Sequence, residues 1–235
     1  MNYQKPTSIR LNKALVQLGL SPSRRKADEL IMTSKVKVNG KVTTTLATTV
    51  IVGVDHITAS GKQGVARNQE TIVLALNKPV GYVCSHNPQG HDRSIFTLLP
   101  KAYSNLKIAG RLDKDSGGLV LLTSDGDLAN RLSHPRYQKS KLYEVTVDKP
   151  LQNAHIKQLS EGVKLHDGIS RFDKVVVLKP KQLTVTLHEG RNRQIRRTFS
   201  ALGITVTRLK RTKLGNATLD KIPTGKYRKL DTIEL

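Results

Sequence analysis

The sequence predicts an α+β protein of two domains: a small αβ module over residues 8–60, and a larger domain over residues 71–232 with a mixed, mainly antiparallel sheet flanked by helices. Two observations predict this class. Short apolar runs separated by turn residues outnumber helical patterns along the chain. Residues 61–70 lack apolar periodicity, and the composition changes at Thr71, so we expect a linker between the two domains.

The first module is predicted to hold two helices followed by short strands. Leucines repeat at helical spacing between residues 11 and 18, and Gly19 follows where a C-terminal cap belongs. Ser21-Pro22 or Ser23 begins the second helix, whose apolar face ends at Ile31. Residues 36–42 alternate around an Asn-Gly pair, which is a strong hairpin signal, and residues 50–52 add a further strand.

The second domain is predicted to consist mainly of strands. Residues 72–76 are all apolar and precede Asn77-Lys78-Pro79, a pattern typical of a buried strand that ends in a turn. Two helices are expected, over residues 127–133 with Asp125 as N-cap and over about 193–202. Further strands are expected at residues 80–84, 118–123, 141–147, 175–178 and 183–187 and near Val206.

The charge indicates a polyanionic partner. The formal net charge is +22, and the basic excess is spread through both halves of the chain. Such a charge opposes compaction unless a polyanion offsets it, so nucleic acid is favoured over an acidic membrane or a surface that is basic for solubility. No stretch approaches the ~20 apolar residues of a membrane helix, so we expect a cytoplasmic protein.

The sequence argues against a metal or a disulfide. Cys84 is the one cysteine, which excludes an internal disulfide and a multi-cysteine metal site, and the seven histidines lack ligand spacing. The acidic, glycine-rich segment 110–127 does not fit a calcium-binding loop. The spacing of Asp113, Asp115 and Gly117 lacks a third oxygen ligand, and Ser124 stands where a bidentate Glu belongs. No metal is therefore predicted.

Asp113 has the properties of a reactive carboxylate. It lies between Arg111 and Lys114, before two glycines, on a loop that enters a buried strand. A short carboxylate flanked by cations stays ionised at neutral pH and is available as a nucleophile or a base.

Three segments of the first module resemble the S4 RNA-binding domain: Arg10-Leu11-Asn12-Lys13, Ser23-Arg24-Arg25-Lys26-Ala27-Asp28 and Val36-Lys37-Val38-Asn39-Gly40. In that family the second helix and the loop after it form the RNA surface. The resemblance implies RNA contacts from Arg24, Arg25, Lys26, Lys37 and Asn39. The alternative is a helical hairpin with a solvated basic face.

Residues 110–127 resemble the signature motif of pseudouridine synthases, Gly-Arg-Leu-Asp followed by a Ser/Thr-Gly-Leu strand. Residues 141–145 and 189–197 resemble that family's second and third motifs, and the ends of the domain resemble the branch that modifies ribosomal RNA. The resemblance implies that Asp113 is the catalytic aspartate, that Tyr143 lies against the target base and that Arg196 pairs with Asp113. Further RNA contacts are expected from Lys78, Arg111, Leu112, Lys114, Arg191, Asn192, Arg193, Gln194 and Ile195.

Simpler interpretations of these residues exist. Tyr143 could be a strand aromatic of the core, and the helix after Arg191 could carry a solvated basic face around a buried stripe that includes Ile195 and Phe199. Cys84, in an apolar strand, is expected to be inert core.

The chemistry of the expected reaction agrees with these residues. Pseudouridylation breaks a C1′–N1 bond and makes a C1′–C5 bond without redox change, so no cofactor is predicted. It needs one carboxylate and a closed site, whereas a glycosidase favours two carboxylates and a water. A base in a duplex has to be flipped out to react.

These observations together predict an isomerase acting on ribosomal RNA, free or in an assembling subunit. Large-subunit 23S RNA is preferred over small-subunit 16S RNA, and the enzyme is expected to be a monomer. A non-catalytic RNA-binding or ribosome-assembly factor is the alternative from another functional class.

Overall fold

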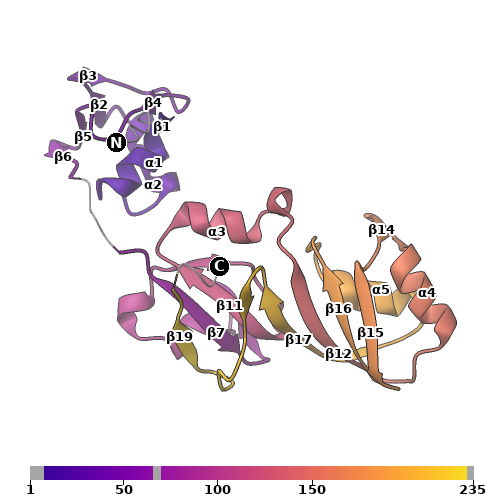
Figure 1. The fold of residues 1–235 in the computed structure, drawn as a ribbon. Helices are drawn as coiled ribbons and strands as arrows, with labels where there is room; N and C mark the ends of the chain where they lie inside the picture. Colours follow the sequence, from indigo (N-terminus) through magenta and orange to yellow (C-terminus); the bar gives the residue numbers. More distant parts are fainter. Residues whose placement is uncertain (1–7, 66–69, 232–235) are drawn as a thin grey trace, which may run out of the picture. The chain divides into compact units, whose positions relative to one another are not determined.

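The computed structural model describes residues 8–65 and 70–231, and the chain divides into two compact units between Glu70 and Thr71 (Figure 1). Each unit has its own hydrophobic core. Among the described residues, no helix has the length and apolar character needed to cross a membrane.

The first unit combines two helices with two small sheets, one of β1 and β4 and one in the order β3-β2-β5-β6. Helices α1 (Leu11–Gln17) and α2 (Arg24–Met32) contact each other, and Ser23 caps α2 by accepting from the Lys26 N–H. The predicted helices and the hairpin are confirmed, and Asn39 and Gly40 take positive φ at the hairpin turn as that pair favours. The strands are β1 (Ile9–Arg10), β2 (Val36–Val38), β3 (Lys41–Val42), β4 (Thr49–Val50), β5 (Ile57–Ala59) and β6 (Lys62–Gln63).

Strand β6 lies inside the segment predicted as a linker. It pairs with β5 through a turn at Ser60 and Gly61, both of positive φ. Its two residues are exposed and polar, so no apolar alternation reveals it in the sequence. The remainder of the predicted linker includes residues 66–69, which lie outside the described residues.

The second unit is built on one large sheet in the order β15-β16-β12-β17-β11-β7-β19, with β10 beside β11 and β18 beside β17. Strands β11 and β17 are parallel and the other pairs of this sheet are antiparallel, as the mixed, mainly antiparallel prediction requires. Its strands are β7 (Val73–Lys78), β10 (Lys107–Ala109), β11 (Gly117–Thr123), β12 (Lys141–Val147), β15 (Lys174–Lys179), β16 (Gln182–Leu187), β17 (Val206–Leu214), β18 (Ala217–Thr218) and β19 (Tyr227–Lys229).

Helices and small pairs of strands complete this unit. Helix α3 (Gly126–Ser133) begins at Asp125, whose carboxylate accepts from the N–H groups of Asp127 and Leu128, so the predicted N-cap is confirmed. The remaining elements are β8 (Tyr82–Val83), β9 (Arg93–Ser94), η1 (Ile95–Leu98), η2 (Lys101–Tyr103), η3 (Pro135–Tyr137), α4 (Asn153–Glu161), β13 (Val163–Leu165), β14 (Gly168–Ser170) and α5 (Gln194–Ala201).

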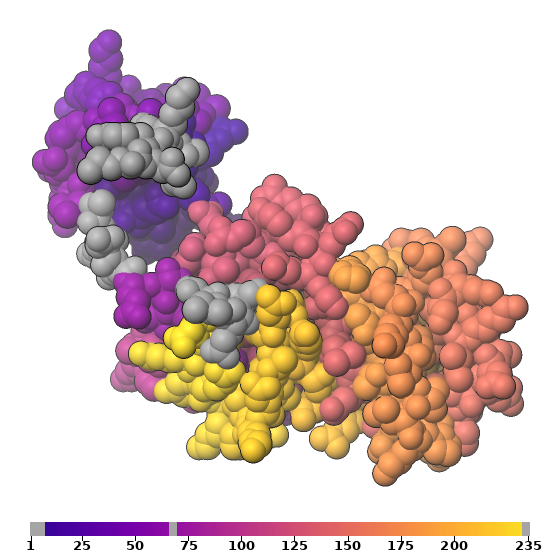
Figure 2. All heavy atoms as spheres, in the orientation of Figure 1, coloured from indigo at the N-terminus to yellow at the C-terminus, as the bar shows by residue number. Residues whose placement is uncertain are grey.

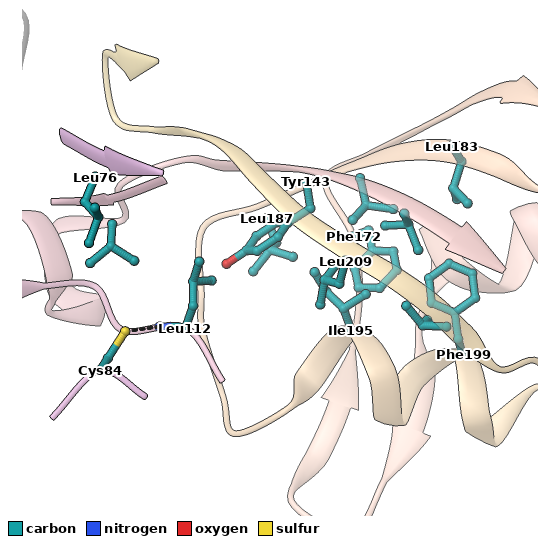
Figure 3. Packing of buried hydrophobic residues seen from close by; sticks show 14 of the residues in the cluster. Leu76, Cys84, Leu112, Tyr143, Phe172, Leu183, Leu187, Ile195, Phe199 and Leu209 are labelled. Atoms are coloured by element: carbon teal, nitrogen blue, oxygen red, sulfur yellow. Dashed lines mark hydrogen bonds between the residues drawn. The ribbon is translucent and has the colours of Figure 1, made fainter. Parts of the chain in front are cut away.

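Strands β7 and β11 are buried on both faces, which explains their continuous apolar runs. Leu74, Leu76 and Val120 belong to the main cluster, which continues to Phe172 and Phe199 at the other end of the sheet (Figure 3). Val73 and Leu119 belong to a second cluster, completed by α3 and the C-terminal segment. The sheet is therefore sandwiched at this end.

The two ends of the large sheet differ in their covering. Figure 2 shows the segment with α4, β15 and β16 in orange on one side of the second unit, and the C-terminal strands in yellow on the other. Helix α4 was not predicted from the sequence. Leu159 is its buried residue, so its apolar stripe is too short to show a helical period. The junction between the two ends is formed by β12, β17 and β11, and the candidate site lies there.

Candidate active site

The loop from Gly110 to Ser116 joins β10 to β11 and carries Asp113. Most of its backbone carbonyls accept hydrogen bonds from N–H groups and side chains of the protein. The Asp113 carbonyl accepts from the Ser116 N–H at 3.1 Å, and the Lys114 carbonyl accepts from the Gly81 N–H at 2.7 Å. Side chains hold the carbonyls of Gly110, Arg111, Asp115 and Ser116. The loop is consequently held along almost its whole length.

Lys78 is buried away from solvent and binds backbone carbonyls of this loop. Its side chain is 1% exposed, and the ammonium donates to the carbonyls of Ser116, Lys114 and Pro79. Burial lowers the pKa of Lys78, while the carboxylates of Asp115 and Asp113 oppose that effect. The prediction that Lys78 contacts RNA is therefore corrected, because its three donors are already used inside the protein.

Asp115 anchors the loop to helix α5. Arg193 donates to its two carboxylate oxygens at 3.0 and 2.7 Å, and Arg196 donates to its backbone carbonyl at 2.8 Å. The Arg196 Nε is 3.2 Å from Asp115 Oδ2, an ion pair by distance without hydrogen-bond alignment. The hydrogen bonds from Arg193 hold the pKa of Asp115 below its ordinary value, and the charge of Arg196 adds to this despite partial burial.

The carboxylate of Asp113 is the uncommitted acidic group of the loop. Within the described residues its side chain has no hydrogen bond or ion pair, and it is half-buried. Burial lowers the pKa of Lys78 and of Arg196, and the charge of Asp113 opposes that effect at both residues. The hydrogen bond with Asp115 raises the pKa of Arg193, and the charge of Asp113 adds to it. The expected pair between Arg196 and Asp113 differs from the structure, because Asp115 takes the direct contact with Arg196. Asp113 is left in a cationic environment with its oxygens available.

Tyr143 enters the same region from β12. It is 7% exposed and pairs in register with Val185 on β16 and Arg211 on β17. It belongs to the main core cluster together with Leu112, which precedes Asp113. Figure 3 shows the ring extending from β12 with its hydroxyl directed towards Leu112. The structure places Tyr143 in the core beside the loop, as the simpler sequence interpretation has it, and its contact with the target base stays a prediction.

The other residues predicted to contact RNA in this unit fall into three groups. Leu112, Gln194 and Ile195 are buried, so the prediction that their side chains contact RNA is corrected; Gln194 donates to Ser170 and Glu189 instead. The cations Lys114 and Arg191 have internal partners, Asp92 for the former and Asp167 and Glu189 for the latter. The exposed members are Arg111, Asn192, Arg193 and also Lys114, whose pair with Asp92 lies at the surface; Arg193 is held by Asp115.

The basic residues of the first unit are at its surface. Arg24, Arg25 and Lys26 form the exposed first turn of α2, and Lys37 is exposed on β2. Asn39 is exposed too, but its side chain donates to Asp55 and accepts from the His56 N–H, so it also fixes the hairpin. Arg24, Arg25, Lys26 and Lys37 are thus exposed to solvent, and their contact with RNA stays a prediction.

Three polar residues of the site were missed from the sequence: Asp115 and two buried cations, Lys141 and Arg211. The Lys141 ammonium donates to the carbonyls of Lys139 and His188, and burial lowers the pKa of Lys141 to about 8. The guanidinium of Arg211 binds the Gly110 carbonyl at the start of the loop and the Leu119 carbonyl in β11, the strand that follows it. The signal for these cations in the sequence was a Lys or Arg at an inward-facing position of an alternating strand. Such a residue is buried only when backbone carbonyls or acidic side chains accept its hydrogen bonds.

Neither a metal site nor a reactive thiol is apparent here. Within residues 8–65 and 70–231, no group of three or more His, Cys, Asp or Glu side chains could hold a metal ion. Cys84 is buried, burial raises the pKa of its thiol, and its sulfur accepts weakly from the Leu112 N–H at 3.5 Å. The chemical capacity of the site is therefore one available carboxylate, a neighbouring aromatic ring and several fixed cations.

Comparison with known proteins places these features in a family. Residues 72–201 match the family model described as RNA pseudouridylate synthase, and residues 9–54 match that of the S4 domain. The chain is 37% identical over 232 residues to ribosomal large subunit pseudouridine synthase B of Bacillus subtilis, covering 96% of this chain and 93% of that protein. It is 39% identical over 230 residues to the dual-specificity RNA pseudouridine synthase RluF of Escherichia coli, covering 97% and 78%.

A solved structure agrees with the sequence relatives. A crystal structure of a pseudouridylate synthase matches with a TM-score of 0.69 and 32% identity, covering 96% of this chain and 97% of that one. Both units of the chain therefore have counterparts in one known protein.

Proposed function

Because this chain belongs to the RNA pseudouridylate synthase family, we propose that it isomerises a specific uridine of ribosomal RNA, with Asp113 as the catalytic residue. The observation that supports this role is the uncommitted carboxylate of Asp113 on a loop whose backbone is fixed from several sides. A reactive group is most effective when the structure around it is already ordered.

The reaction balances without an added group. The C1′–N1 bond breaks, the uracil turns, and C5 forms the bond to C1′. The C5 hydrogen is released as a proton, and N1 ends protonated. Asp113 supplies the nucleophile or base, and the ring of Tyr143 supplies a flat surface for the freed uracil. A uridine in a helix is out of reach of a half-buried carboxylate, so the target base is flipped into the site.

Large-subunit 23S RNA is the preferred substrate in this proposal, and 16S RNA is the alternative. The name of the Bacillus subtilis relative specifies the large subunit, while the Escherichia coli relative is named as dual-specificity. Exposed basic residues of the first unit are suited to RNA phosphates, which fits recruitment of a structured RNA. Mapping pseudouridines in both ribosomal RNAs from cells lacking this protein distinguishes the two substrates.

Asp113→Asn tests the catalytic assignment. The amide keeps the shape and removes the anionic oxygen, so release of tritium from RNA carrying [5-³H]uridine should stop while RNA affinity changes by less than about threefold. The matched control is Asp125→Asn, because asparagine caps a helix as well as aspartate does and Asp125 only caps α3. Turnover by Asp113→Asn, or equal losses in both variants, would contradict the role of Asp113.

A further inference from the structure

Arg211 lies where the three central strands of the large sheet meet. Its Cα is the register partner of Tyr143 on β12 and of Gly118 on β11. Directly opposed residues of an antiparallel pair have their side chains on the same face, so Arg211 and Tyr143 share one. The backbone approach to β11 is close, since a Cβ on Gly118 would be 2.2 Å from the Arg211 carbonyl oxygen. Arg211 is thus paired both with β12, the strand that carries Tyr143, and with β11, the strand that follows the loop with Asp113.

The Arg211 side chain binds the start of that loop and the strand β11 that follows the loop. Its Nη2 donates to the Gly110 carbonyl and its Nη1 approaches the Arg111 carbonyl at 3.5 Å, both at the entry. Its Nε donates to the Leu119 carbonyl at 2.8 Å, just beyond the exit. Arginine suits this arrangement because its donors diverge in a rigid plane.

The burial of Arg211 is costly for a residue with only a packing role. The side chain is 1% exposed, and among the described residues it forms no ion pair with a carboxylate. Backbone carbonyls alone offset the loss of hydration, and an apolar side chain of similar length would fill the space at lower cost. We therefore attribute the presence of arginine at position 211 to its charge and to the planar, diverging N–H donors of its guanidinium.

We propose that Arg211 is a positioning residue that fixes the loop of residues 110–116, and with it the Asp113 carboxylate, relative to Tyr143. The inference rests on the proposed function of Asp113. Arg211 does not touch the substrate in this account. It acts through the carbonyls of Gly110, Arg111 and Leu119, so it governs the rate of the chemical step and not the affinity for RNA.

Arg211→Lys tests the proposal, because lysine keeps the charge but a single ammonium lacks the planar fork. The single-turnover rate on ribosomal RNA transcripts should fall by about 10- to 100-fold, with RNA affinity within about threefold and a cooperative unfolding transition retained. Amide hydrogen exchange should accelerate at Leu112 and Ser116, whose N–H groups are bonded at the loop. Arg208→Lys, an exposed change on the same strand, should leave the rate and the exchange unchanged.

The outcomes separate this inference from the function on which it rests. A folded Arg211→Lys protein with a rate within about twofold of wild type would overturn it, and so would a rate loss fully accounted for by weaker RNA binding. If Arg211→Lys does not fold, Gly110→Ala takes its place, since a Cβ there would meet Leu214 at 3.1 Å and the guanidinium at 3.5 Å. Gly110→Ala should show the same selective rate loss, and full turnover by it would overturn the inference.

A wild-type protein that forms no pseudouridine would contradict the proposed function instead. In that case hydrogen exchange still decides the role of Arg211, because it requires no turnover. Unchanged exchange at Leu112 and Ser116 in Arg211→Lys would overturn that role.

Discussion

At the scale of single residues, the two carboxylates of the active-site loop have different surroundings. Asp115 is held by two arginines, whereas Asp113 has cations nearby and no direct partner among the described residues. The family resemblance identifies the first carboxylate from its motif, but the sequence gives no sign of the second. Which of two aspartates in Asp-Lys-Asp meets an arginine 78 residues away depends on how α5 packs beside β17, and that is tertiary information.

Asp115→Asn should slow turnover because Arg193 and Arg196 then lose their fixed anchor beside Asp113. We expect a rate loss of about tenfold, with a stability loss below about 1 kcal/mol because the pair is partly exposed. Asp167→Asn is the matched control, since Asp167 accepts a similar pair of hydrogen bonds from Arg197 at 2.9 and 2.7 Å. Single-turnover kinetics and thermal unfolding of both variants check this.

The comparison of Asp115→Asn with Asp167→Asn is not affected by the pH of a neutral assay. Arg197 holds the pKa of Asp167 at about 2, and Arg193 holds the pKa of Asp115 below its ordinary value. A lowered carboxylate pKa gives a stabilisation that is present above the unfolded value near 4 and is lost as pH falls through the folded value. At neutral pH both pairs are intact in the wild type. Equal rates for the two variants would mean that Asp115 serves only the local fold.

At the scale of elements, the sequence is most informative where a strand is buried on both faces. Strands β7 and β11 appear as apolar runs, and the structure buries every residue of both. Elements with a single buried face or none were predicted less accurately from the sequence. Helix α4 and the strand pair β13–β14 were not predicted, and β6 was assigned to the linker. Their few buried residues leave the apolar periodicity too weak to detect.

The junction of β11 with β17 depends on the absence of a side chain at Gly118. This residue has φ +103°, and a Cβ would meet the backbone of Arg211 at 2.2 Å. Gly118→Ala should therefore cost more than about 3 kcal/mol in the free energy of unfolding, because neither strand can retreat without opening the sheet.

Gly90 provides the matched control for Gly118. It also has positive φ, but a Cβ there meets nothing within 4 Å, so Gly90→Ala should cost only about 1 to 2 kcal/mol of backbone strain. Urea unfolding of both variants checks the difference. A similar cost at the two positions would show that β11 and β17 are farther apart than the structure has them.

At the scale of the whole molecule, the charge and the order of the motifs predicted the architecture of the chain. They did not predict the side-chain geometry of the site. The two units, the mixed sheet and the family follow from patterns spread over the chain. The roles of Lys78 and Gln194 did not follow, because a motif marks a position as important without saying whether its side chain faces RNA or the protein interior. For Lys78 the backbone carbonyls that surround the ammonium decide the matter, and they come from a loop 36 to 38 residues further along the chain.

The basic first turn of α2 leads to a prediction about the full chain. Changing Arg24, Arg25 and Lys26 together to glutamine should weaken binding to ribosomal RNA and reduce the slope of log K against log salt by roughly two to three, if each cation neutralises one phosphate. The rate at saturating RNA should change little, because contacts to phosphates outside the reacting nucleotide contribute equally to ground state and transition state. Equilibrium binding at several salt concentrations and single-turnover kinetics measure the two effects.

The control for total charge is a second triple variant, in which Lys174, Lys179 and Lys181 are changed to glutamine. These lysines are exposed around the edge strand β15, and their loss removes the same three charges. If both triple variants lower the salt slope equally, binding follows net charge and not the α2 surface. If the α2 variant instead lowers the saturated rate while leaving the slope unchanged, the first unit does not bind phosphates there but orders the active site, and its role as a recruiting module is contradicted.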